Sequence, residues 1–510
     1  MKGGLRMNLV NVGDERLKKF GDTRAYVFEG QEFTSSRLNE MSRKLAAGLK
    51  SLGIGRDDHV VVSLSNSPEV FACFGAIWRL GAVIVPIMFL LGEEETRYIL
   101  DHSDAKAVVT SVDLLEKIEN ARKGIDHIKH IIVLGGEDQG DQVDFHGLIE
   151  KHPPLQLTEE MNEDDVALMI YTSGTTGRPK GVMLSHNNLY QNALATWKAN
   201  EAAKGDITLI CLPLAHSFGV VVMNSGNLSR FKESFGVLMR WFDPEEVFRL
   251  IEKYRVTQFI GVPTMYQILV NHPAGDKFDT SSLERCTISA APVTEELYRT
   301  FTTKFECKMY EGYGLTEASP AVALCRPSMP IKKGSTGIPI PGVEVKIFDA
   351  EDRELPSGEQ GEVVVKGPNV MLGYYKSPEE TAETLRGGWL HTGDVGYLDE
   401  EGYLFITDRF KDMIIKGGYN IYPSEIEGYL AEHPAVSEIA IIGIPDEKYG
   451  EEIMAFIVRM PDQDLSEDAV IEYAKSRITP FKAPSRVKFV DGLPKSLVGK
   501  VLKRELRKFV

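Results

Sequence analysis

The sequence predicts an α/β protein with a large N-terminal domain of stacked α/β layers plus a β subdomain, followed by a small mobile α+β C-terminal domain. Helical and strand patterns alternate over 35–291, short β runs with turn signals follow Gly334, and a compact mixed set begins at Pro423. At 510 residues the chain exceeds one typical domain of roughly 100–200 residues. We therefore predict two domains, 1–410 and 411–510.

The alternation starts with four elements in succession. Residues 35–53, SSRLNEMSRKLAAGLKSLG, have the amphipathic period of a helix, and 58–66, DHVVVSLSN, have a strand pattern. Residues 68–81, PEVFACFGAIWRLG, predict a second helix, and 82–87, AVIVPI, a buried strand. The same alternation continues in AKAVVTS, HIIVLG, TLICLPL, PEEVFRLIEKYRV, TQFIGVP and RCTISAA. Such a series predicts sheets layered between helices.

The β subdomain is predicted from 343–367, VEVKIFDAEDRELPSGEQGEVVVKG, and from 402–408, GYLFITD. The joint to the C-terminal domain is expected near 407–418, TDRFKDMIIKGG. Beyond it, helix and strand patterns follow in SEIEGYLAEHP, VSEIAIIGIPD, EEIMAFIVRM, SEDAVIEYAKSRI, SRVKFV and the amphipathic KVLKRELRKF. This set predicts a separate α+β unit.

Composition and charge narrow the classes of partner. The chain is 43% hydrophobic and 26% charged, as expected of a soluble globular protein, and its formal charge of -16 argues against a nucleic-acid partner. Five cysteines show no CxxC pair, which argues against a zinc site or a disulfide framework. The most apolar stretch, 75–92, is interrupted by Arg79 and Pro86, so we expect no signal peptide or membrane span. A cytoplasmic monomer or homodimer acting on small molecules is predicted.

One loop carries an unusual density of polar groups. Residues 171–181, YTSGTTGRPKG, directly follow the apolar run VALMI. Backbone N–H groups, hydroxyls and a lysine after a strand suit a phosphate, although a flexible surface loop rich in turn formers would have a similar composition. The P-loop pattern does not fit, because Pro179 occupies the place of its second glycine and Lys180 precedes a glycine. Ser185 is the expected N-cap of the next helix.

This loop and seven further segments, in order along the chain, resemble the signatures of the adenylate-forming superfamily, which includes acyl-CoA synthetases. The segments are YTSGTTGRPKG (171–181), LPLAHSFG (212–219), GVPTMY (261–266), SAAPV (289–293), YEGYGLTEASP (310–320), GWLHTGD (388–394), DRFKDMIIKGGYNIYPSEIE (408–427) and PKSLVGK (494–500). The resemblance is closest to bacterial medium- and long-chain fatty-acid CoA ligases. It implies ATP-dependent ligation of a carboxylic acid to coenzyme A through acyl-AMP, with ATP, Mg²⁺ and coenzyme A as cofactors.

The resemblance also implies a set of binding residues. Nucleotide or coenzyme contacts are expected at Thr172, Ser173, Gly174, Thr175, Thr176, Gly177, Lys180, Ala290, Ala291, Pro292, Glu311, Gly312, Tyr313, Gly314, Thr316, Asp394, Arg409, Gly417 and Gly418. Chemistry alone favours three of the expected roles. The aromatic face of Tyr313 can stack on a base, the hydroxyl of Thr316 can bond a phosphate, and Glu317 can hold Mg²⁺. Family members use these residue types in the same way.

The remaining roles come from the same motifs. Asp394 is implied to bind the ribose with help from Arg409, and His216 to orient the acid or stabilise its charge. Lys500, with Thr316 and Glu317, is an expected catalytic residue, because a cation is needed where a carboxylate attacks the α-phosphate. Lys411 matches the hinge position of the family. Gly417 and Gly418 would leave room for the pantetheine arm.

Several points stay open in the sequence. Ala290 and Ala291 stand where relatives often carry a glycine, which puts the size of the substrate in doubt. The acyl pocket is expected to be lined from 216–223, 261–264 and 312–315. The fatty-acid assignment rests on resemblance alone, and aromatic or alicyclic acids use the same machinery. Two rival hypotheses are an adenylating enzyme whose acceptor is a carrier-protein arm or oxygen instead of free coenzyme A, and a non-catalytic adenylate sensor. The sensor predicts loss of Lys500 or Glu317, and both are present.

Overall fold

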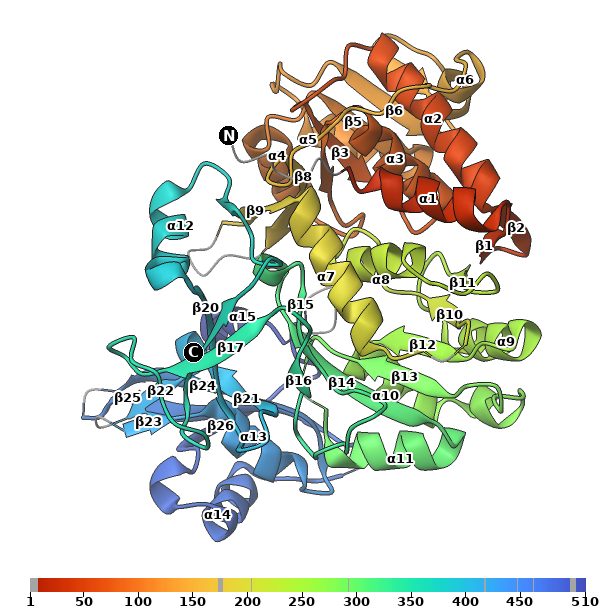
Figure 1. Cartoon of the computed structure of the whole chain (residues 1–510). Coiled ribbons are helices and arrows are strands. Elements are labelled where there is room, and N and C mark those ends of the chain that lie inside the picture. Colours follow the sequence, from red (N-terminus) through yellow and green to blue (C-terminus); the bar gives the residue numbers. More distant parts are fainter. Residues whose placement is uncertain are drawn as a thin grey trace.

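The computed structural model of the chain describes residues 8–172, 178–202, 204–291, 293–416, 419–446, 448–461, 463–495 and 501–510. Two large mixed sheets, a smaller antiparallel sheet and a C-terminal sheet are each packed with helices (Figure 1). The predicted α/β class, with a large N-terminal part and a smaller C-terminal part, is confirmed. The boundary at 410/411 remains a prediction.

The first sheet is mostly parallel and is covered on both faces. Its strands, in spatial order, are β19 (Gly373–Tyr374), β9 (Lys180–Ser185), β8 (Val166–Thr172), β4 (Val83–Pro86), β3 (His59–Ser63), β5 (Ala107–Ser111), β6 (His130–Leu134) and β7 (Gln142–Asp144). The helices around it are α1 (Val10–Phe20), α2 (Ser35–Ser51), α3 (Pro68–Arg79), α4 (Glu93–His102), α5 (Leu115–Ala121) and α6 (Phe145–Glu150). Side chains of β3 alternate between the two cores, since Val60 and Val62 pack with α2 and α3 whereas Val61 packs with α4 and α5.

The second sheet repeats this plan. Its strands, in spatial order, are β16 (Ile338–Pro339), β15 (Ala321–Leu324), β14 (Lys308–Gly314), β13 (Arg285–Ile288), β12 (Gln258–Gly261), β10 (Ile207–Ile210), β11 (Phe235–Leu238), β1 (Arg24–Phe28) and β2 (Gln31–Thr34). Helices α9 (Pro244–Tyr254), α10 (Pro263–Asn271) and α11 (Glu295–Phe305) cover one face, where they bury Leu209, Phe259 and Cys286. The opposite face looks toward α7 (His186–Ala199) and α8 (Ser217–Asn227).

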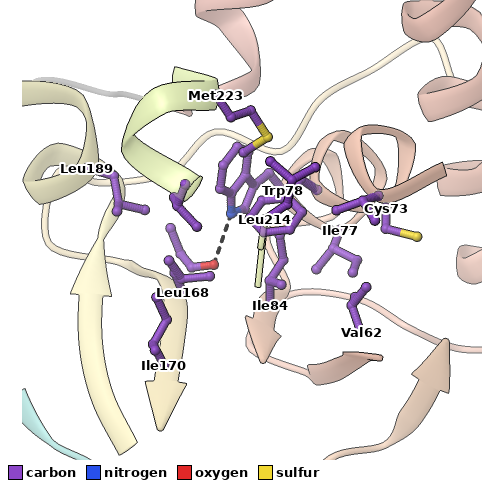
Figure 2. Close-up of a cluster of buried hydrophobic side chains, with 14 of the residues drawn as sticks. Val62, Cys73, Ile77, Trp78, Ile84, Leu168, Ile170, Leu189, Leu214 and Met223 are labelled. Atoms are coloured by element: carbon purple, nitrogen blue, oxygen red, sulfur yellow. Dashed lines mark hydrogen bonds between the residues drawn. The ribbon is translucent and has the colours of Figure 1, made fainter. Parts of the chain in front are cut away.

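Helices α3, α7 and α8 therefore lie between the two sheets, and their apolar side chains form one core with both. Figure 2 shows the part of this core around Trp78, next to β3, β4 and β8. Trp78 of α3 reaches toward β8, where its indole N–H donates to the carbonyl of Ala167 at 2.9 Å. Met223 of α8 lies against the same indole in Figure 2. Burial of an aromatic ring is strongly stabilising when its one polar atom is hydrogen-bonded, as it is here. This core fixes α8, whose first turn carries His216 as N-cap.

The smaller sheet is the predicted β subdomain. It is antiparallel, in the order β17 (Glu344–Phe348), β18 (Gly361–Lys366), β20 (Leu390–Leu398) and β21 (Leu404–Arg409), and α12 (Pro378–Thr384) precedes β20. The polypeptide then passes through a short 3-10 turn, Phe410–Asp412, into the C-terminal sheet. The expected hinge, Lys411, occupies the middle of that turn.

The C-terminal sheet contains β23 (Tyr419–Ile421), β22 (Ile414–Lys416), β25 (Gly450–Arg459), β24 (Val436–Asp446) and β26 (Arg486–Phe489), with helices α13 (Pro423–Ala431), α14 (Glu467–Arg477) and α15 (Lys503–Leu506). It has its own apolar cores on both faces. Ser424, in the first turn of α13, donates to Asp408 Oδ2 through its backbone N–H and its hydroxyl, each at 2.9 Å. These bonds connect the C-terminal unit to the end of β21.

Two local expectations had different outcomes. Ser185 is the N-cap of α7, and it forms a capping box in which its hydroxyl accepts from the N–H of Asn188 at 3.1 Å. The last amphipathic pattern gives only the short helix Lys503–Leu506 before a 3-10 turn. Within the described ranges, no helix is both long enough and apolar enough to cross a membrane.

Candidate active site

A large cavity of about 980 Å³ lies where the carboxyl ends of β10, β12, β13 and β14 meet the start of α8 and the β subdomain. In α/β sheets ligands bind at this edge, since the loops that follow the strands converge there. The lining includes predicted site residues from distant segments, namely Thr172, Lys180, His216, Ala290, Tyr313, Gly314, Thr316, Glu317 and Arg409. The fold thus brings together side chains that are far apart in sequence.

Asp394 does not itself line the cavity among the described residues, but it is buried directly behind one wall and is the centre of the polar contacts there. Its Oδ2 accepts a hydrogen bond from the Tyr313 hydroxyl at 2.6 Å, and the Nε of Arg409 lies 2.7 Å from its Oδ1. Strand pairing produces this arrangement, because Asp394 on β20 lies opposite Arg409 on β21. Burial, together with the Asp394 charge, raises the pKa of Tyr313 well above its usual value. The phenol therefore remains a donor to the carboxylate.

A second polar group surrounds Glu317. Its Oε1 accepts from the Tyr374 hydroxyl at 3.1 Å, and burial raises the pKa of Glu317. Because the neighbouring donor is neutral, a cation beside this carboxylate would stabilise its charged form. Oxygen ligands of this kind are those that Mg²⁺ prefers, so Glu317 fits the metal-binding role expected from the sequence.

Lys180 lies close to this group. Its Nζ is 2.7 Å from Glu380 Oε1 and 5.0 Å from the centre of the Tyr374 ring. Glu380 belongs to α12 and lines the same cavity. The lysine that ends the predicted phosphate loop is thus paired with a carboxylate inside the site.

His216 is fixed by the start of α8. Its Nδ1 accepts the backbone N–H of Phe218 at 3.2 Å, and burial lowers the pKa of His216 to about 4. The ring is therefore neutral near pH 7, and since Nδ1 accepts, Nε2 carries the proton. The next residue, Ser217, shares a hydrogen bond of 3.1 Å with Thr316, which ties α8 to the turn bearing Glu317.

The other predicted residues take different positions. Ala290 lines the cavity with a positive φ of 78°, a conformation that suits glycine, the residue that the resemblance leads one to expect there. Gly312 and Ala291 lie next to lining residues, and the hydroxyl of Ser289 donates to the carbonyl of Gly312 at 2.7 Å. Glu311 does not line the cavity among the described residues, and burial raises its pKa to about 7.

Several expected residues lie outside the described ranges. They are Ser173, Gly174, Thr175, Thr176, Gly177, Pro292, Gly417, Gly418 and Lys500, and the side chain of Lys411 is also not described. Their roles remain predictions from the motifs.

The cavity continues away from these groups between the second sheet and helices α7 and α8. Of the expected acyl-pocket segments, 216–223 and 312–315 contribute lining residues. No described residue of 261–264 lines it; the neighbouring Ile260 does, because its side chain points to the α8 face of the strand. Tyr374, Glu380, Thr208 and Gln258 are lining residues that motif reasoning missed. Each lies outside the recognised segments, so no local signal marked it.

Comparison with known proteins agrees with this geometry. Residues 13–375 match the family described as AMP-binding enzyme, and 425–500 match the AMP-binding enzyme C-terminal domain. The long-chain-fatty-acid–CoA ligase of Bacillus subtilis (strain 168) is 35% identical, with 98% of this chain and 94% of that protein covered. Feruloyl-CoA synthase of Amycolatopsis sp is 36% identical, with 94% of each covered.

The fold of the chain is also similar to that of a solved structure. The ATP-bound MatB from Rhodopseudomonas palustris superimposes with a TM-score of 0.90 at 30% identity, over 99% of both chains. Family match, full-length relatives and the composition of the cavity all agree. The chain therefore belongs to the AMP-binding enzyme family and is an adenylate-forming enzyme of the acyl-CoA synthetase class.

Proposed function

We propose that the enzyme joins a carboxylic acid of medium or long chain length to coenzyme A through an acyl-AMP intermediate. The observation that carries this proposal is the cavity itself. At one end it is lined by Tyr313 and Arg409, which both contact the buried Asp394 behind them, and from there it runs past His216 between apolar side chains of the second sheet and α8. A polar nucleotide end joined to a largely apolar arm suits an acid whose carboxylate meets ATP.

The reaction has two half-steps. In the first, a carboxylate oxygen attacks the α-phosphorus of ATP, and the bond from that phosphorus to pyrophosphate breaks. In the second, the coenzyme A thiolate attacks the acyl carbonyl carbon, and the bond from that carbon to the AMP oxygen breaks. The activated species is the mixed anhydride, so no nucleophile of the protein is required.

Each described residue has a role that follows from its environment. The carboxylate of Asp394, already aligned by Arg409, would accept the ribose hydroxyls, and the ring of Tyr313 would face the base. The neutral Nε2–H of His216 would donate to the substrate carboxylate without titrating near pH 7. When ATP binds, Lys180 would leave its partner Glu380 and bind the ATP phosphates instead.

Two further roles complete the proposal. Mg²⁺ would be held by Glu317 and the ATP phosphates, and it would supply charge neutralisation. Lys500, which is outside the described residues, is proposed from its motif to neutralise the same charge in the first half-step. Lys411 is proposed as the hinge, and Gly417 and Gly418 as the coenzyme path.

An aromatic acid is the second candidate substrate. It is favoured by the relative named feruloyl-CoA synthase and by polar side chains, Thr208 and Gln258, that line the arm of the cavity. Both candidates share the two half-steps and differ only in the body of the acid.

The test is AMP release from ATP and Mg²⁺ with acids from acetate to stearate, benzoate and cyclohexanecarboxylate, each with and without coenzyme A. We expect turnover that depends on coenzyme A and rises with the apolar size of the acid. Asp394→Asn provides the site-impaired control. Turnover with no acid in the panel would contradict the proposal, and adenylation that coenzyme A does not accelerate would reassign the acceptor.

A further inference from the structure

The far end of the cavity arm is polar, and the strand register shows where it lies. On the cavity face of the second sheet, Ile210 pairs with Ile260 in the row nearer the nucleotide end. Two residues deeper, Thr208 pairs with Gln258, and Gln258 pairs with Arg285. Since side chains alternate along strands, these residues share one face and the polar row forms the floor of the arm.

These side chains form a connected network. The hydroxyl of Thr208 donates to Gln258 Oε1 at 3.3 Å, and Gln258 Nε2 donates to Asn200 Oδ1 at 3.5 Å. Arg285 donates to the carbonyl of Asn200 at 3.0 Å and forms an ion pair with Asp206. Gln258 is only 6% exposed. Its amide is therefore both buried and oriented by its neighbours.

Gln258 retains unused hydrogen-bonding capacity. A glutamine amide has two N–H donors and an oxygen with two lone pairs. Among the described residues, the structure gives Nε2 one acceptor and Oε1 one donor. Burying a polar group whose hydrogen-bonding capacity is not used destabilises the complex, so a polar group on a ligand at this position would be favoured over a methyl group.

The charges at the floor of the arm further restrict which chemical group of a ligand can bind there. Arg285 is neutralised by Asp206, which itself lines the cavity. Arg16, which also lines the cavity, donates to the backbone carbonyls of Ser229, Phe231 and Ser234. Both cations therefore already have acceptors, and a hydroxyl or carbonyl would meet the Gln258 amide without an electrostatic cost. The chemistry that fits is a neutral hydrogen-bonding group.

Strand geometry sets how deep in the arm this group lies. Thr208 lies two residues before the end of β10 (Ile207–Ile210), and residues 211–215 then lead to His216, so the polar row lies roughly 7 Å deeper in the arm than the end of the strand. Resting on the proposed function, we propose that the acid carries a hydroxyl or carbonyl group at the end remote from its carboxylate, bound by Gln258 and Thr208. Two acid classes present such a group at the end remote from the carboxylate: hydroxylated aryl-propenoic acids and ω-hydroxy aliphatic acids of medium length.

Matched substrate pairs test the inference. The kcat/KM for coenzyme A-dependent AMP release is measured with 4-hydroxycinnamate against cinnamate, and with 10-hydroxydecanoate against decanoate. We expect at least a roughly tenfold preference for the hydroxylated member of one pair, because a site built to bond a hydroxyl rejects the analogue that lacks it. The pair that shows the preference identifies the acid class.

Variants separate recognition from general damage. Gln258→Leu should remove the preference and leave or improve kcat/KM for the unsubstituted acid. Thr208→Val is the alternative variant in case Gln258→Leu does not fold, and it should weaken the preference. Ile260→Val, in the apolar row, should change both members of a pair alike. Equal kcat/KM within both pairs in the wild type, or a preference that survives both polar substitutions, would overturn the inference while the ligase function stands. Absence of AMP release with every acid would instead overturn the proposed function.

Discussion

The hydroxyl of Tyr313 donates a hydrogen bond of 2.6 Å to Oδ2 of Asp394. Tyr313 lies near the end of β14 in the second sheet and Asp394 lies on β20 of the β subdomain, so this bond connects two sheets at the wall of the cavity. Arg409, directly before the turn into the C-terminal unit, pairs with the other oxygen of Asp394. The proposed nucleotide site thus depends on the junction of three parts of the chain.

Asp394→Asn should lower kcat/KM for ATP by roughly 100-fold. The substitution removes the charge that pairs with Arg409 and the acceptor proposed for the ribose, and losing such a charged partner costs about 1.5–3 kcal/mol. Tyr313→Phe keeps the ring and should cost roughly 3–10-fold. Steady-state kinetics with ATP varied would check both, and a larger effect of Tyr313→Phe would contradict the central position of Asp394.

Glu380→Gln should lower the KM for ATP by about 2–5-fold, because Lys180 no longer has a carboxylate partner inside the site. Lys180→Met should instead raise the KM by more than roughly tenfold. The exposed neighbour Glu379 provides the matched control, since Glu379→Gln changes the net charge of α12 equally. If Glu380→Gln and Glu379→Gln change the KM for ATP equally, the effect comes from the net charge of α12 and the Lys180–Glu380 pair is not its cause.

His186 should make the protein sensitive to acid. Its side chain is fully buried, its Nδ1 accepts the N–H of Leu9 at 3.3 Å, and burial lowers its pKa to about 4. The unfolded state binds a proton more readily, so stability is present above the unfolded pKa of about 6.5 and falls as pH drops toward 4. The loss from this group approaches about 3 kcal/mol at pH 4.

Urea unfolding measured from pH 7 to pH 4 tests whether the free energy of unfolding falls as the pH drops. His186→Gln should flatten the dependence, whereas His146→Gln, at an exposed histidine, should leave it unchanged. A slope that is the same in the wild type and in His186→Gln would exclude His186 as the cause.

Ala290→Gly should raise the free energy of unfolding by up to about 1 kcal/mol. A left-handed backbone costs a residue with a Cβ about 1–2 kcal/mol, and the greater entropy of glycine in the unfolded chain offsets part of that gain. Ala291→Gly, where φ is not positive, should lower stability. Chemical denaturation gives the free energy of unfolding of both variants. A lower value for Ala290→Gly than for the wild type would contradict the claim that the backbone at Ala290 is strained.

Local patterns predicted most of the framework. The helix at 35–53, the buried strand at 82–87 and the cap at Ser185 all follow from periodicity and short-range chemistry, and they appear as expected. The final amphipathic pattern did not give one helix of its length, because periodicity reports which face is apolar and does not fix where backbone hydrogen bonds end.

Long-range pairs could not be predicted in the same way. Lys180 and Glu380 meet only because β9 and α12 are brought together by the fold, and Gln258 faces the cavity because of the register of β12. The motifs located the nucleotide end, where residue type alone suggests chemistry. The depth and polarity of the acyl arm depend on packing between sheet and helix, which sequence patterns do not encode.

The most direct test of the acyl-AMP route uses an acid labelled with ¹⁸O in both carboxylate oxygens. Attack of the carboxylate on the α-phosphorus and later cleavage of the acyl carbon–oxygen bond transfer one labelled oxygen to AMP. Mass spectrometry should therefore find one ¹⁸O in each AMP and none in pyrophosphate. Unlabelled AMP, or label in inorganic phosphate released with ADP, would show that the carboxylate does not attack the α-phosphorus and would contradict the proposed reaction.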